Sequence, residues 1–67
     1  MKGIGKIIDY TGSSGFIIDN NGYKYILSSI NILYDNPKNG DLVSFNIEKF
    51  KTVEIDELIA TFVKKIN

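Results

Sequence analysis

The chain has 67 residues, 43% of them apolar, and its eight lysines balance eight acidic residues without any arginine. A domain of this size buries only about 60% of its unfolded surface, and without cysteine or histidine it has neither a disulfide framework nor the usual zinc ligands. Zero net charge excludes the general field that draws basic proteins to polyanions, and no apolar run approaches the roughly 20 residues of a membrane span.

Three short strands joined by tight turns are predicted in the first part of the chain. We expect the first strand over residues 2–10, where two early glycines indicate a bend of the kind that small barrels need to close. A second strand is expected over 15–19 and a third over 23–27, because β-branched and aromatic residues dominate both. The Asn-Asn-Gly run at 20–22 predicts a hairpin turn between them.

A helical turn, a loop and a fourth strand are expected next. The run Ser-Ser-Ile at 28–30 favours a short helical turn with a serine as its cap. Residues 34–41 hold Asn, Asp, Pro and Gly, which predict a loop. Over 42–49 apolar residues alternate with polar ones, as in a half-buried strand.

The last segment, 57–65, allows two interpretations. Its apolar residues recur at spacings of three and four, as on an amphipathic helix, whereas Thr61, Phe62 and Val63 favour a strand. We favour the strand, because a fifth strand closes a barrel and removes exposed sheet edges. The sequence therefore predicts one all-β domain over 1–67, a small five-stranded antiparallel barrel.

Several short motifs follow one another along the chain. They are the runs 3–8 (GIGKII), 12–17 (GSSGFI), 24–27 (KYIL), 40–45 (GDLVSF) and 60–63 (ATFV). In order and spacing these runs resemble the motifs of the cold-shock domain family, whose members have an OB-fold and bind single-stranded nucleic acid. The resemblance spans nearly the whole chain and implies the same barrel.

The resemblance also implies where a ligand binds. In the family, aromatic side chains on the first three strands form a platform on which bases stack, while nearby lysines face the phosphates. The family has Trp, Phe, Phe, Phe and His at the positions of Ile7, Ser14, Phe16, Tyr25 and Leu27. Two further tyrosines and two lysines lie close to these positions in the sequence. The candidate nucleic-acid-binding residues are Lys6, Ile7, Tyr10, Phe16, Tyr23, Lys24, Tyr25 and Leu27.

We therefore expect weak binding of single-stranded RNA or DNA with little sequence preference. Three missing stacking groups, at roughly 1–3 kcal/mol each, are a large share of a micromolar interaction of about 8 kcal/mol. The alternative is a protein partner or a homodimer through the apolar face of Phe16 and Tyr25, since such patches usually mark interaction sites. A different small barrel, such as an SH3-like one, is a further alternative for the fold.

Catalysis, a cofactor and a bound metal are not expected. The sequence shows no nucleophile paired with an activating base, and the Gly-x-x-Gly run at 12–15 joins two predicted strands instead of leading into a helix. The first residues show no signal-peptide pattern, so we expect a cytoplasmic protein without a membrane partner.

Overall fold

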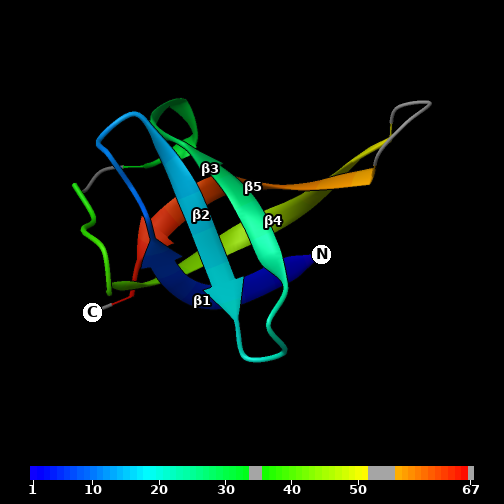
Figure 1. The fold of residues 1–67 in the computed structure, drawn as a ribbon, viewed down its shortest axis with the longest axis horizontal. Coiled ribbons are helices and arrows are strands. Elements are labelled where there is room, and N and C mark those ends of the chain that lie inside the picture. The colour runs from blue at the N-terminus through cyan, green and yellow to red at the C-terminus, as the bar shows by residue number, and fades with distance from the viewer. Residues whose placement is uncertain (34–35, 52–55, 67) are drawn as a thin grey trace.

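The computed structural model describes residues 1–33, 36–51 and 56–66, which form a five-stranded β-barrel (Figure 1). The strands are β1 (Lys2–Ile8), β2 (Ser14–Asp19), β3 (Lys24–Ser28), β4 (Leu42–Lys51) and β5 (Asp56–Lys65), and one turn of 3₁₀ helix, η1 (Ser29–Asn31), follows β3. Among these residues no helix has the length and apolar character needed to cross a membrane. The all-β class and the five strands are confirmed.

The strands close into a ring in the order β1-β2-β3-β5-β4, with β4 returning to β1. Four neighbouring pairs are antiparallel, but β3 and β5 run parallel and meet at Ile26 and Ile59. The prediction that all pairs are antiparallel is therefore wrong at this one position. Directions cannot alternate all the way round a ring with an odd number of strands, so one parallel pair is unavoidable. The ring is consistent with a small OB-fold-like barrel.

The structure moves several predicted boundaries. β1 ends at Ile8 because Asp9 has a φ of 52°, in the left-handed region that breaks a strand. Tyr10 consequently lies in the β1–β2 turn. Tyr23 lies just before β3, which begins at Lys24, so both tyrosines are outside the strands in which they were predicted. Ser28 occupies the N-cap position of η1, as predicted, but its side chain makes no capping hydrogen bond.

The last segment is a strand, and the helical alternative is wrong. β5 pairs with β4 from Asp56, opposite Lys51, to Lys65, opposite Val43, with one irregularity in the register. At this irregularity Thr61 pairs with Asn46 and Lys64 with Ser44, so two residues of β5 face Phe45 alone. Such a β-bulge changes the side to which the following residues point. The bulge therefore accounts for the spacing of three between the buried residues Ala60 and Val63, which resembles that of a helix.

The core fills the barrel with alternate residues of each strand. Gly5 and Gly15 add inward positions without side chains, and a Cβ on Gly5 would lie 2.6 Å from both the Ile17 side chain and the Ile18 carbonyl oxygen. β1 and β2 are thus held in close contact. The buried apolar side chains are Ile7, Ile17, Tyr25, Leu27, Val43, Phe45, Ala60 and Val63. Since successive side chains of a strand point to opposite faces, this core also fixes which residues point outward.

Candidate functional site

The outer surface of β1, β2 and β3 carries two cross-strand rows of side chains. In one row Phe16 stands between Ile8 and Ile26, and in the other Ile18 stands between Lys6 and Lys24. Figure 1 looks onto β2 and β3, which pass in front of β4 and β5. We call this surface the front face, and its residues are Lys6, Ile8, Phe16, Ile18, Lys24 and Ile26.

Phe16 is the central aromatic group of the front face. Its side chain is 37% exposed, although it sits in the middle strand of three. The ammonium nitrogen of Lys24 lies 5.3 Å from the centroid of the Phe16 ring, within the range of a cation–π contact. A positive charge thus borders an accessible ring, while the neighbouring isoleucines are half-buried.

Tyr25 is not on the front face, so its predicted place in an exposed platform is wrong. The residue is 5% exposed, and its ring lies 4.9 Å from that of Phe45, centroid to centroid, inside the barrel. Its hydroxyl donates a hydrogen bond of 2.7 Å to Asp19 Oδ2. This hydrogen bond raises the pKa of Tyr25 to about 12 and is the main cause of a lowered pKa at Asp19.

Ile7 and Leu27 are also core residues. Both are completely buried, so neither takes part in an exposed platform as predicted. The alternation of each strand places Ile8, Ile26 and Ser28 outward instead. The sequence interpretation matched the motifs in order but placed the outward residues of β1 and β3 one position too early.

Tyr23 and Tyr10 lie apart from the front face. Tyr23 is 59% exposed and borders a mainly apolar hollow of about 280 Å³, together with Met1, Ile47 and Leu58. Tyr10 borders a different hollow of about 350 Å³ beside Gly12 and Pro37. Of the eight predicted residues, the front face therefore unites three, Lys6, Phe16 and Lys24.

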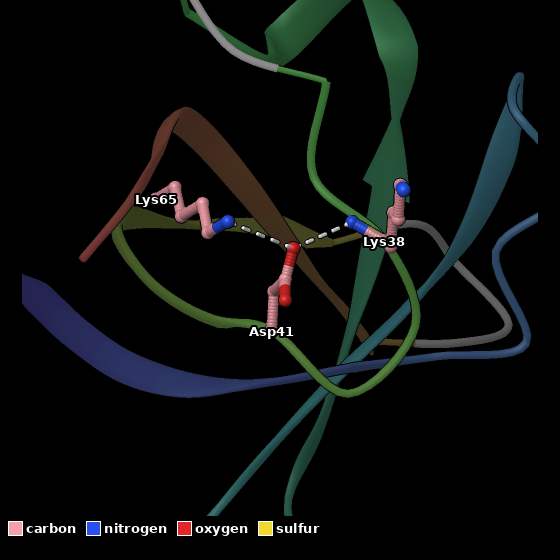
Figure 2. A network of polar contacts seen from close by, with 3 residues as sticks. All are labelled: Lys38, Asp41 and Lys65. Carbon is pink, nitrogen blue, oxygen red and sulfur yellow. Dashed lines mark hydrogen bonds and ion pairs between the residues drawn. The ribbon is translucent and has the colours of Figure 1, made fainter. Parts of the chain in front are cut away.

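Two side chains fix the loop next to Tyr10. The amide of Asn39 accepts a hydrogen bond from the Tyr10 N–H at 2.7 Å and donates one to the Tyr10 carbonyl at 3.0 Å. Asp41 Oδ2 accepts a hydrogen bond of 2.8 Å from the Lys38 N–H and lies 3.6 Å from Lys65 Nζ (Figure 2). The hydrogen bond from Lys38 and the charge of Lys65 lower the pKa of Asp41. These contacts connect the 36–41 loop to the β1–β2 turn and to the end of β5.

Two isoleucines of the front face, Ile8 and Ile26, were missed by sequence reasoning. Ile8, Ile18 and Ile26 each pair across the sheet with a front-face residue that was predicted. A strict two-residue alternation, counted along each strand from a core position, would have identified Ile8 and Ile26 as well. In the described residues no group of three or more acidic side chains could hold a metal ion. The front face offers a stacking contact at Phe16, apolar contacts at its isoleucines and point charges at Lys6 and Lys24.

Comparison with known proteins adds no assignment to this geometry. No family model matches the chain, and no significant sequence match to a protein of curated function is found. The resemblance to the cold-shock domain family therefore remains a prediction, and functional argument depends on the exposed residues of the barrel.

Proposed function

We propose that the front face binds single-stranded RNA or DNA weakly and with little sequence preference. The observation that carries this proposal is the exposed Phe16 ring with the Lys24 ammonium 5.3 Å from its centroid. A base stacked on a ring gains roughly 1–3 kcal/mol, whatever its identity, because every base has a π-face. One ring instead of several implies low affinity, and stacking without base-edge hydrogen bonds implies low specificity.

The lysine row supplies the charge that such a ligand needs. Lys6 and Lys24 are exposed and flank Ile18 across the sheet. Asp19, which follows Ile18 in β2, accepts hydrogen bonds from the Tyr25 hydroxyl and from the N–H groups of Asn21 and Tyr23. Lysines meet phosphates as point charges, without the two-pronged geometry of arginine. The front face therefore matches a phosphate backbone in charge but does not read its sequence.

Binding of a fluorescent oligothymidine, measured by anisotropy in low salt, tests this proposal. Phe16→Ala should weaken binding by about fivefold or more, the equivalent of one lost stacking contact. Phe50→Ala is the matched control, because Phe50 is also exposed but lies on β4 away from the front face. If the two variants bind equally well, the proposal is wrong.

Self-association is a second candidate function of the front face. The half-buried isoleucines Ile8, Ile18 and Ile26 surround Phe16 with aliphatic side chains. A surface for nucleic acid would be expected to carry further aromatic rings at these positions, so the aliphatic groups favour a protein contact. A contact between two copies would bury this surface, and Phe16→Asp would then shift the protein to a smaller species. Sedimentation velocity over a range of concentrations decides the matter, and a concentration-independent monomer excludes this candidate.

A further inference from the structure

Phe62 presents an aromatic ring from an unfavourable backbone position. Its φ of 49° lies in the left-handed region that residues with a Cβ rarely adopt. It belongs to the β-bulge of β5, between the pairs Ser44–Lys64 and Asn46–Thr61. Bulges redirect side chains, and here the redirected ring is 63% exposed. The ring is therefore mostly outside the core, and its burial does little to offset the cost of the strained backbone.

The Phe62 ring borders a hollow of about 300 Å³ on the outer side of β4. Lys2 of β1 pairs with Asn46, and Lys64 of β5 pairs with Ser44, so the two lysines approach β4 from the strands on either side of it. We call this site the back hollow. The residues that line it are Lys2, Leu33, Ser44, Phe45, Asn46, Phe62 and Lys64.

The back hollow is positively charged. No carboxylate lines it within the described ranges, and in that part of the chain neither Lys2 nor Lys64 is within ion-pair distance of an acidic group. The hydroxyl of Ser44 and the amide of Asn46 add neutral hydrogen-bonding groups between the lysines. A ligand that complements this set has a flat ring, polar edges and an anionic group.

We propose that the back hollow binds one nucleotide unit of a single-stranded nucleic acid, with its base on Phe62 and its phosphate facing Lys2 and Lys64. Aromatic stacking beside lysines is the general chemistry of single-strand binding. The site is separate from the front face, because β4 and β5 lie behind β2 and β3 in Figure 1. It goes beyond the proposed function and does not depend on binding at Phe16.

Amide chemical shifts of the Phe16→Ala protein, titrated with a short oligothymidine in low salt, test the back hollow alone. The amide signals of Ser44, Asn46 and Lys64 should shift in a saturable manner. Phe62→Gly removes the ring and tolerates a positive φ, so it should raise the dissociation constant by about fivefold or more. Absence of saturable shifts at these amides would overturn the proposal.

Matched variants separate loss of the site from loss of the fold. Phe50→Ala removes a ring of similar exposure, 56%, from the same outer side of β4 and should leave these shifts unchanged. Lys64→Gln leaves Phe62 and the bulge in place and should weaken binding, whereas Lys51→Gln at the end of β4 should not. The proposal would be contradicted if Phe62→Gly and Phe50→Ala weakened binding equally, or if Lys64→Gln and Lys51→Gln did.

Thymidine monophosphate distinguishes a strand from a free nucleotide as the ligand. It should shift the same amides more weakly than the oligothymidine, because each strand presents several identical units to the one site. Equal affinity for the two would overturn the assignment to a strand. Failure of the front-face proposal would be seen separately, as missing shifts around Phe16 in the unmodified protein.

Discussion

At the scale of single residues, Tyr25 shows why the candidate site was only partly predictable. Its residue type suits a stacking platform, and the sequence motif suggested that role. The structure instead buries its ring against Phe45 and directs its hydroxyl to Asp19. Asp19 also accepts hydrogen bonds from N–H groups of the turn after β2. Residue type was informative, but the direction of the side chain depends on strand alternation, which the motif did not reveal.

Tyr25→Phe tests the hydrogen bond to Asp19. The folded protein holds the pKa of Asp19 below its ordinary value of 3.8, mainly through this hydroxyl. A carboxylate with a lowered pKa in the folded protein stabilises the fold at pH values above its pKa in the unfolded chain. This contribution is lost as the pH falls through its pKa in the folded protein. Tyr25→Phe should therefore lower the free energy of unfolding near neutral pH and reduce its decline between about pH 5 and pH 2. Urea denaturation over this range checks the prediction, and an unchanged acid dependence would contradict it.

The left-handed conformation of Phe62 makes a second prediction for single residues. Glycine tolerates a φ of 49°, whereas alanine keeps the Cβ atom, which makes this φ unfavourable. Phe62→Gly should therefore have a free energy of unfolding about 1 kcal/mol higher than that of Phe62→Ala. Both variants lose the same exposed ring, so chemical denaturation isolates the backbone effect. A more stable alanine variant would show that the position is not strained.

At the scale of elements, the existence of the strands could be predicted and their finer geometry could not. Alternation and turn residues correctly indicated five strands and the short helical turn. The bulge in β5 produced a helix-like spacing, because one extra residue changes the side to which later residues point. A bulge depends on the partner strand, so the sequence of β5 alone does not show it.

The contact between β1 and β2 depends on Gly5. A Cβ there would approach the Ile18 carbonyl oxygen and the Ile17 side chain to 2.6 Å, so one of the strands must shift. Gly5→Ala should lower the free energy of unfolding by about 1–3 kcal/mol, the usual cost of overpacking. Ser14→Ala, on the exposed outer side of β2, is the control and should change it little. Equal thermal stability of the two variants would contradict the close contact.

At the scale of the whole molecule, the barrel has no net charge but places lysines in two local groups. Lys6 and Lys24 flank the front face, and Lys2 and Lys64 border the back hollow. Composition alone suggested little attraction to nucleic acid, because it averages over the surface. The closed ring brings lysines from separate strands next to single exposed phenylalanines, an arrangement that composition does not reveal.

Two lysines on the front face predict a shallow salt dependence. Each phosphate neutralised on a single strand contributes about −0.7 to the slope of log affinity against log salt, so two give about −1.4. The slope is measured from the front-face amide shifts with oligothymidine at several salt concentrations. Lys24→Gln should make the slope less negative by about 0.7. A slope unchanged by this variant would remove Lys24 from phosphate binding.

Binding at the front face is tested most directly by the amide chemical shifts of the unmodified protein during titration with oligothymidine in low salt. We predict saturable shifts of the Lys6, Phe16 and Lys24 amides. The dissociation constant obtained from the Lys6 and Lys24 shifts should rise by about fivefold or more in Phe16→Ala but not in Phe50→Ala. If these front-face amides do not move at saturating oligonucleotide, the protein does not bind single-stranded nucleic acid there.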